Sequence, residues 1–203
     1  MHRKYTSLIT FGLLFSTSVA FAQNTSWYTI NQSYKTGVEL LDKEKYAAAF
    51  EQFQRVEETR LIPSSQAADL KQISLIKENA QYYQAVCALE LGNQDAEGLF
   101  LTFIKEYPGS SNTKLAYYHV GRSYFNQKNY TKAIEWFKKT DANNLNGKEN
   151  TDYRFKLAYS YFFTENYKDA EPLFAKLKDE KSKYQESSIY YSAYLSYLNA
   201  DYK

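Results

Sequence analysis

The sequence predicts an all-α fold, an α-solenoid built from antiparallel helix pairs, and three observations support this class. The pattern Tyr-x-x-Ala-x-x-x-Phe begins at Tyr46, Tyr130 and Tyr167. A variant begins at Asn93 and a further start is at Tyr202, so the last three intervals are 37, 37 and 35 residues, as expected for stacked helix-turn-helix units. A small residue within an apolar run precedes each start by eight or nine residues. These small residues are Gly37, Ala85, Gly121, Ala158 and Ala193.

The spacing of small and large residues has a direct packing explanation. A small residue in the first helix lets the second helix cross close to it, and the Ala and Phe of the second helix fill the contact. The third copy shows the full pattern in Tyr117, Val120, Gly121, Tyr124, Tyr130, Ala133 and Phe137. This pattern resembles the tetratricopeptide repeat (TPR) family over roughly residues 27–203. The resemblance implies a right-handed superhelix of about four full repeats and the first helix of a fifth.

The breaks between apolar runs predict the bounds of each unit. Full helix pairs are expected over residues 27–60, 67–109, 112–141 and 151–180, and a partial fifth repeat over 185–203. Pro63 and its neighbouring serines interrupt the pattern after the first pair. A polar loop is expected from Asp141 to Asn150.

The fifth repeat raises a question about the length of the natural chain. Its first helix is rich in Ile, Tyr and Leu, whereas the last helix of a solenoid normally has a polar outer face. We therefore expect residues 23–203 to be the N-terminal part of a longer repeat protein. The alternative is that this helix associates with another molecule.

Residues 1–22 have the features of a cleaved secretory signal peptide. A basic start at Arg3 and Lys4 precedes an apolar run and the small-x-small site Ala20-Phe21-Ala22. An uncleaved membrane anchor is the alternative, but the apolar run is short for a bilayer. Gln23 follows the predicted cleavage site where a lipoprotein would carry Cys, so an exported protein without a lipid anchor or transmembrane segment is expected.

The composition argues against several functional classes. Cleavage leaves 23 basic and 23 acidic residues, so no charge excess favours nucleic acid. The single Cys87 excludes an intramolecular disulfide, and His119 is the only histidine of the mature chain. No phosphate-binding glycine loop, zinc-ligand pair or calcium loop is present in the sequence. We expect no cofactor, no metal and no catalytic activity.

Aromatic residues form the one conspicuous candidate site, among 21 Tyr and 13 Phe. Aligned on the small residue of each repeat, three positions of one helix face carry mainly aromatic or other apolar side chains, the last of them being Phe162 in the fourth repeat. In the resembled family this face lines the concave groove that holds partner peptides. The candidate groove residues are Tyr34, Tyr82, Tyr118, Arg122, Phe155, Tyr159, Tyr190 and Tyr194. The alternative for each ring is packing between neighbouring repeats.

The sequence and the resemblance together favour a non-catalytic scaffold that binds a protein or peptide in the bacterial envelope, in the periplasm or at the outer membrane. Two alternatives remain open. The repeats could form the N-terminal arm of a larger exported enzyme or sensor, or the aromatic face could bind glycans.

Overall fold

The computed structural model describes residues 26–60 and 67–199, and within these ranges all regular secondary structure is helical. The prediction of an all-α fold is therefore confirmed. The chain divides into two compact units, Met1–Asp95 and Ala96–Lys203. The predicted second repeat is divided between the units, because its first helix belongs to one and its second helix to the other.

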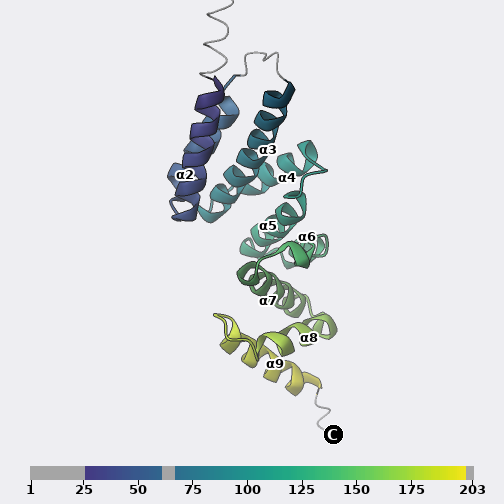
Figure 1. Ribbon diagram of the computed structural model, residues 1–203. Coiled ribbons are helices and arrows are strands. Elements are labelled where there is room, and N and C mark those ends of the chain that lie inside the picture. The colour runs from purple at the N-terminus through teal and green to yellow at the C-terminus, as the bar shows by residue number, and fades with distance from the viewer. Residues whose placement is uncertain (1–25, 61–66, 200–203) are drawn as a thin grey trace, which may run out of the picture. The chain divides into compact units, whose positions relative to one another are not determined.

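The first unit contains an N-terminal helix over residues 26–42, α2 (Tyr46–Glu58) and α3 (Ala67–Glu90) (Figure 1). α2 packs against α3. Its core residues are Ile30, Ala49, Phe53, Val56, Ile73, Ile76, Ala80 and Cys87. Both the pattern residues of α2, Ala49 and Phe53, are fully buried.

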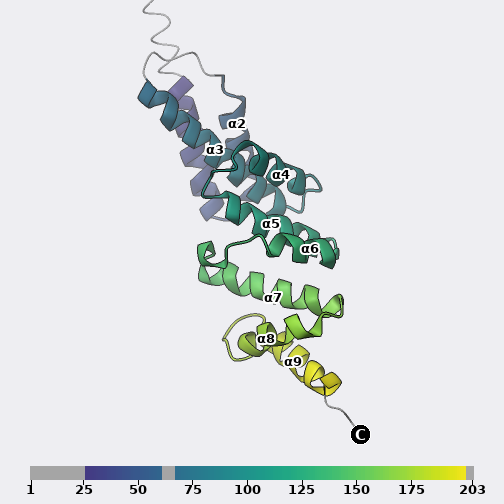
Figure 2. The ribbon, with the colours of Figure 1, turned by 90° about the vertical axis from the view of Figure 1, so that its right-hand side faces the viewer.

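The described part of the second unit contains six α-helices, each of which packs against the next along the chain. They are α4 (Ala96–Glu106), α5 (Thr113–Asn126), α6 (Tyr130–Phe137), α7 (Gly147–Phe163), α8 (Tyr167–Leu177) and α9 (Gln185–Asn199). Figure 2 shows this order, and α5 also contacts α7. The first helices α5 and α7 therefore touch one another as well as their own second helices.

Close crossing of paired helices explains the small residues of the pattern. A Cβ atom added at Gly121 would lie 2.5 Å from the Phe137 ring, and one added at Gly37 would lie 2.7 Å from the Phe53 ring. Both phenylalanines are completely buried and so have no room to withdraw. Glycine at these two positions is a packing requirement of the helix pair.

One backbone turn is used four times to reverse the chain between helices. Glu44, Lys128 and Glu165 have φ of 56°, 60° and 59°, and Gly92 has φ of 72°. After each of them a backbone N–H donates to a carbonyl five residues earlier at 2.9 Å, as Asn129 does to Tyr124. This is the left-handed C-terminal cap of a helix. Three of these positions lack glycine, so the turn is maintained by the packing of the helices that it joins.

The prediction of a polar loop over residues 141–150 is wrong from Gly147 onward, where the chain is helical. A short 3₁₀ helix, η1 (Ala142–Asn144), is followed by α7, which begins at Gly147. Asn146 and Glu149 form a capping box, in which the Asn146 side chain accepts from the Glu149 N–H at 2.9 Å and the Glu149 carboxylate accepts from the Asn146 N–H at 3.0 Å. The first turn of a helix is often as polar as a loop, so composition alone does not distinguish the two.

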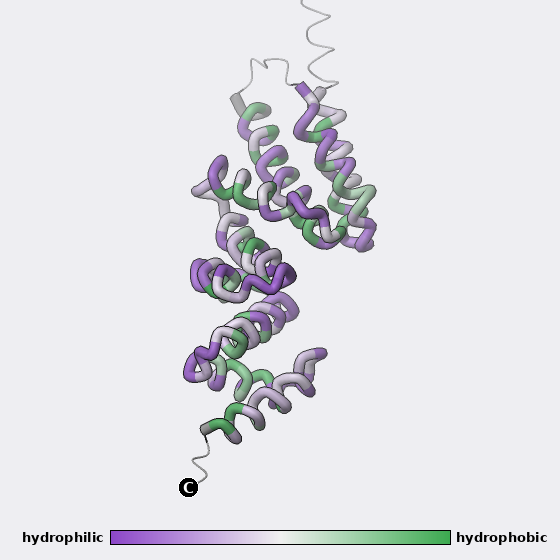
Figure 3. The backbone as a smooth tube through the Cα atoms, turned by 180° about the vertical axis from the view of Figure 1, so that it is seen from behind, coloured by the Kyte–Doolittle hydropathy of each residue, from purple (hydrophilic) through white to green (hydrophobic). Residues whose placement is uncertain are grey.

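Hydrophobic and hydrophilic stretches alternate along the helices of each unit (Figure 3). Among the helices that the structure describes, none combines the length and the hydropathy required to cross a bilayer. The predicted signal peptide, the interruption at Pro63 and the final start at Tyr202 lie outside the described residues.

Candidate partner-binding surface

The eight predicted groove residues differ widely in exposure. Tyr82, Tyr118 and Phe155 are buried, with 5%, 2% and 8% of their surface accessible. Tyr34, Arg122 and Tyr159 are half-buried, whereas Tyr190 and Tyr194 are 62% and 40% exposed. Tyr34 and Tyr82 belong to the first unit and the other six to the second, so the structure brings only those six into one unit.

In the first unit the two predicted residues pack against neighbouring rings. The Tyr34 ring lies 6.2 Å from Phe53 and 6.4 Å from Tyr83, and the Tyr82 ring lies 5.4 Å from Tyr83. Burial, followed by the nearby Tyr83, raises the pKa of Tyr34. These contacts indicate that both side chains contribute to the packing of the unit.

In the second unit a continuous set of rings connects α5, α6, α7 and α9. We call it the aromatic cluster, and its members are Phe125, Tyr130, Tyr159, Phe162, Phe163, Tyr190, Tyr191 and Tyr194. Tyr159 lies at its centre, stacked on Phe163 at 4.4 Å and edge-on to Tyr191 at 5.5 Å. Ring pairs at these separations are favourable beyond the area that they bury.

Part of the aromatic cluster faces solvent. Phe163 is 48% exposed, and its ring lies 5.3 Å from the half-buried Tyr130. Neither residue is among the eight predicted groove residues. Phe163 occupies the position after the aligned ones, and Tyr130 was interpreted only as the start of the helix pattern. A helix-face analysis that included the next position along α7 would have found Phe163.

Phe155 has a structural role between repeats. Its ring stacks on Tyr184 at 4.1 Å with the planes 11° apart, and it meets Phe174 edge-on at 6.1 Å. Only 8% of its surface is accessible, so Phe155 packs beneath the predicted groove and offers little contact area to a partner.

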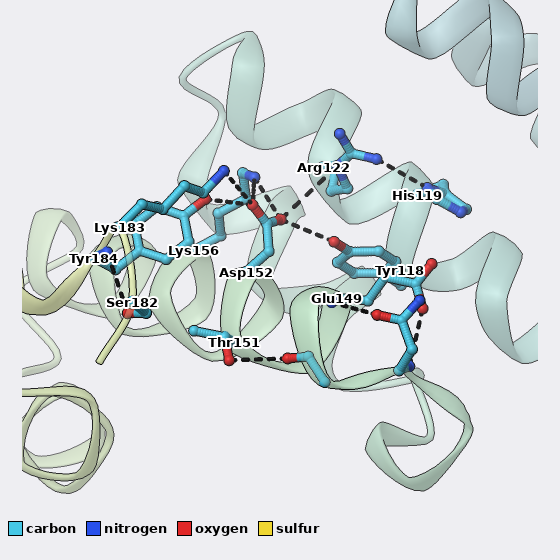
Figure 4. A network of polar contacts seen from close by, with 12 residues as sticks. Tyr118, His119, Arg122, Glu149, Thr151, Asp152, Lys156, Ser182, Lys183 and Tyr184 are labelled. Carbon is cyan, nitrogen blue, oxygen red and sulfur yellow. Dashed lines mark hydrogen bonds and ion pairs between the residues drawn. The ribbon is translucent and has the colours of Figure 1, made fainter. Parts of the chain in front are cut away.

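Several polar side chains meet at the Asp152 carboxylate of α7, and we call this set the Asp152 cluster (Figure 4). The Tyr118 hydroxyl of α5 donates to Asp152 Oδ2 at 2.9 Å, and the Tyr184 hydroxyl donates to Oδ1. The Lys156 ammonium donates to both carboxylate oxygens. Arg122 Nε and Lys183 Nζ each lie 3.9 Å from the carboxylate. One carboxylate thus joins side chains from three successive repeats.

The surroundings keep Asp152 ionised. Burial acts to raise its pKa, but the Lys156 ammonium and the hydrogen bonds from Lys156, Tyr184 and Tyr118 more than offset this, so the pKa is below its ordinary value. The pKa of Tyr118 is raised, mainly by burial, so its hydroxyl remains a proton donor. The cluster is a fixed ion-pair network at the pH of ordinary solutions.

His119 is part of the packing. It is 4% exposed, and its ring stacks on Phe100 at 5.1 Å with the planes 13° apart. Burial, followed by the Arg122 guanidinium, holds its pKa well below the ordinary value, so the imidazole is neutral. Arg122 Nη1 lies 3.3 Å from His119 Nδ1. A neutral, buried ring in stacked contact with Phe100 contributes to the packing of the unit.

Cys87 is the remaining candidate for chemistry. Cys87 is fully buried in α3, and burial, followed by Glu90, raises the pKa of its thiol to about 12, which disfavours the reactive thiolate. Across residues 26–60 and 67–199, no group of His, Cys, Asp and Glu side chains could hold a metal ion.

Comparison with known proteins extends these observations. The family model of the YfiO outer membrane lipoproteins matches residues 28–129, half of the chain. The match begins in the N-terminal helix and ends at the residue before α6. The chain belongs to this family. No curated protein gives a significant match.

Two similar solved structures contain the nearly identical TPR-like repeats of a Podosopora anserina kinesin light chain protein, one of them with a single substitution. They are 13% and 14% identical to this chain, with a TM-score of 0.55 for each. The alignments cover 85% of this chain and 87% and 88% of the other chains. At this identity the likeness concerns the fold alone, and with the family match it confirms the prediction of a TPR-like α-solenoid.

The family name and the sequence differ in one respect. The family is described as one of lipoproteins, whereas Gln23 occupies the position at which the sequence analysis looked for a lipid-attachment Cys. The absence of a lipid anchor stays a prediction, since residues 1–25 lie outside the described ranges.

Proposed function

We propose that this chain is a non-catalytic scaffold of the bacterial envelope that binds a protein or peptide partner across the aromatic cluster of the second unit. The observation that carries the proposal is the exposure of Phe163 and Tyr194 at the rim of a connected set of rings. Rings at the rim offer contact area to a partner. Their half-buried neighbours already restrict the rim side chains, so these side chains lose little conformational entropy on binding.

The hydroxyl groups of the aromatic cluster suit a polypeptide partner. Tyr130 and Tyr159 are half-buried, and each carries a hydroxyl that can bond to a peptide group while its ring makes apolar contact. Burial, followed by the neighbouring Tyr159, raises the pKa of Tyr130, so this hydroxyl stays protonated. Tyrosine is among the residues that contribute most to binding energy at protein interfaces.

The envelope location in this proposal comes from the family description and from the signal-like residues 1–22.

Site-specific photo-crosslinking tests the proposal. A photoreactive phenylalanine analogue would replace Phe163 in the cluster, and the same analogue at Leu101 of α4, an apolar residue with 36% exposure, would serve as the control. In envelope extract we expect a defined adduct from position 163 and none from position 101. Equal adducts at the two positions, or none at either, would contradict the proposal.

The identified partner then allows a quantitative measurement. We expect the double variant Phe163→Ser, Tyr194→Ser to bind the purified partner at least about tenfold more weakly, a loss of about 1.4 kcal/mol. Unchanged circular dichroism would show that the fold is kept. If position 163 captures polysaccharide in place of polypeptide, the glycan-binding alternative replaces this one.

A further inference from the structure

The Asp152 cluster contains more positive than negative charge. Its carboxylate has three cationic side chains within 4 Å, which are Arg122, Lys156 and Lys183. The carboxylate of Glu149, which also acts on the cluster through space, is engaged in the capping box at the start of α7. Around Asp152 itself, two positive charges are therefore in excess.

The oxygens of Asp152 have no capacity for a further donor. A carboxylate offers about four lone-pair sites. The hydroxyls of Tyr118 and Tyr184 use two of them, and the Lys156 ammonium, which donates to both oxygens, uses the others. Lys183 Nζ lies 3.9 Å from Oδ1, which is beyond hydrogen-bond distance. Its attraction to Asp152 is electrostatic, so its N–H groups can donate to an acceptor that a partner supplies.

The connector between α8 and α9 holds Lys183 in place. Arg154 binds Glu180 through two nitrogens, Nη1 to Oε1 at 2.6 Å and Nη2 to Oε2 at 2.7 Å. On the other side of Lys183, the Tyr184 ring stacks on Phe155 at 4.1 Å. The Lys183 ammonium lies 4.8 Å from the centre of the Tyr184 ring. Because the backbone on both sides is anchored, Lys183 loses less conformational entropy when it binds a ligand.

The Asp152 cluster adjoins the aromatic cluster of the proposed binding surface. The Lys156 ammonium lies 5.7 Å from the centre of the ring of Phe125, a member of the aromatic cluster. The Phe155 ring, on which Tyr184 stacks, lies 5.9 Å from the Tyr159 ring at the centre of that cluster. An excess of positive charge is thus placed beside a surface of exposed rings.

The burial of the cations favours a single carboxylate over an extended anionic surface. The side chains of Lys156 and Arg122 are only 12% and 19% exposed, whereas that of Lys183 is 67% exposed. A flat lipid surface would reach only Lys183. A carboxylate on a side chain can approach Lys183 and also feel the recessed charges, which water screens less.

We infer that Lys183, with Lys156 and Arg122 behind it, binds an aspartate or glutamate side chain of the partner beside the aromatic rim. The partner is then an acidic peptide segment that carries an apolar residue close to its carboxylate. This inference rests on the proposed function and adds to it the charge of the partner.

Synthetic peptides test the charge preference before a natural partner is known. Each peptide is acetylated and amidated, contains one phenylalanine, and carries either glutamate or glutamine at a neighbouring position that is varied along an array. The best pair is then labelled with fluorescein and titrated with the protein. We expect the native protein to prefer the glutamate peptide by about fivefold. Lys183→Gln should reduce this preference to less than about twofold, whereas Lys183→Arg, which retains the charge, should keep it.

A lysine of the same connector provides the matched control. Lys181 is also exposed, and Lys181→Gln removes the same charge. It should leave the preference for glutamate unchanged. If Lys181→Gln and Lys183→Gln reduce the preference equally, the effect is one of overall charge and the inference is wrong.

Phe163→Ser separates this inference from the proposed function. It should weaken the glutamate and glutamine peptides equally, because it removes a ring of the rim and no charge. If both peptides bind in a manner that depends on Phe163 but with equal affinity, the carboxylate site is wrong and the aromatic surface stands. If no peptide binds the native protein, the carboxylate site is also wrong, and crosslinking at position 163 tests the proposed function independently.

Two other anions would overturn the inference. A peptide without glutamate but with a free C-terminal carboxylate is the first. If it binds in a manner that depends on Lys183 while the amidated glutamate peptide does not, the ligand is a chain end. Vesicles that contain phosphatidylglycerol are the second. If the native protein binds them, Lys183→Gln does not, and the peptides show no charge preference, the ligand is a lipid surface.

Discussion

The Tyr118 hydroxyl of α5 donates a 2.9 Å hydrogen bond to Oδ2 of Asp152, which lies on α7, the first helix of the following repeat. Tyr118 is 2% and Asp152 is 8% exposed, so this bond lies inside the contact between repeats. The same carboxylate accepts from Tyr184, which precedes α9. Asp152 therefore connects three repeats that otherwise meet through ring packing.

Asp152→Asn should destabilise the protein. The change removes the negative charge beside Lys156 and replaces one acceptor oxygen with a donor, so buried donors lose their partner. We expect a loss of roughly 1–3 kcal/mol in the free energy of unfolding, measured with urea. Asp179→Asn, at an exposed position, is the control and should change stability by less than about 0.5 kcal/mol. Equal effects of the two changes would show that the cluster contributes nothing specific.

His119 should make stability depend on pH. Its folded pKa is well below the ordinary value, so below about pH 6.5 the unfolded chain binds a proton that the folded chain does not. Stability is then fully present above pH 6.5 and falls as the pH decreases, by up to about 1.4 kcal/mol per pH unit.

Urea unfolding at several pH values between 5 and 8 checks this dependence. His119→Phe keeps a ring against Phe100 and removes the titrating group, so its stability should change much less over the same range. A native protein whose stability is flat between pH 5 and 7 would contradict a neutral buried imidazole.

Gly121→Ala should be destabilising although alanine favours helix. The added Cβ would lie 2.5 Å from the ring of the fully buried Phe137, so the helices α5 and α6 must separate or repack, at a cost of about 1–3 kcal/mol. Gly98→Ala in α4 has no neighbouring atom within 4 Å and should be stabilising or neutral. Thermal unfolding of the two variants measures the difference, and partial recovery of Gly121→Ala by Phe137→Leu would locate the clash.

Asn146→Ala should loosen the start of α7. The change removes the side-chain acceptor for the Glu149 N–H, at a cost of about 1 kcal/mol, whereas the backbone N–H of residue 146 can still donate to the Glu149 carboxylate. Hydrogen exchange of the amides in residues 147–150 should become faster, while exchange in the centre of α7 is unaffected. Asn143→Ala, an exposed residue of η1, is the control.

The contacts within each helix pair were predictable because they join residues close in sequence. Gly121 and Phe137 lie on two helices separated by one short turn, so a fixed spacing of small and aromatic residues encodes their meeting. The turns were also encoded in part, since α2, α6 and α8 each begin two residues after a left-handed residue such as Lys128.

The candidate site was predictable only in outline. The alignment of repeats found the helix face that carries Tyr118, Phe155, Tyr159 and Tyr194, but it treated equivalent positions as equally exposed. In the structure Tyr118 is 2% exposed, whereas Tyr190, at the equivalent position of the last repeat, is 62% exposed. A repeat period assigns the same environment to each copy, whereas the exposure of a side chain depends on what packs against that copy.

The sequence by itself determined the helical class, the repeat length and the small-to-aromatic contact within each pair, because these depend on helical periodicity and on residues close along the chain. Only the tertiary structure decided which rings form the aromatic cluster and how Asp152 binds Tyr118 and Tyr184 from 34 and 32 residues away. These features arise where one repeat stacks on another, and the angle and offset of that stacking are set by the packing of all the side chains in the contact.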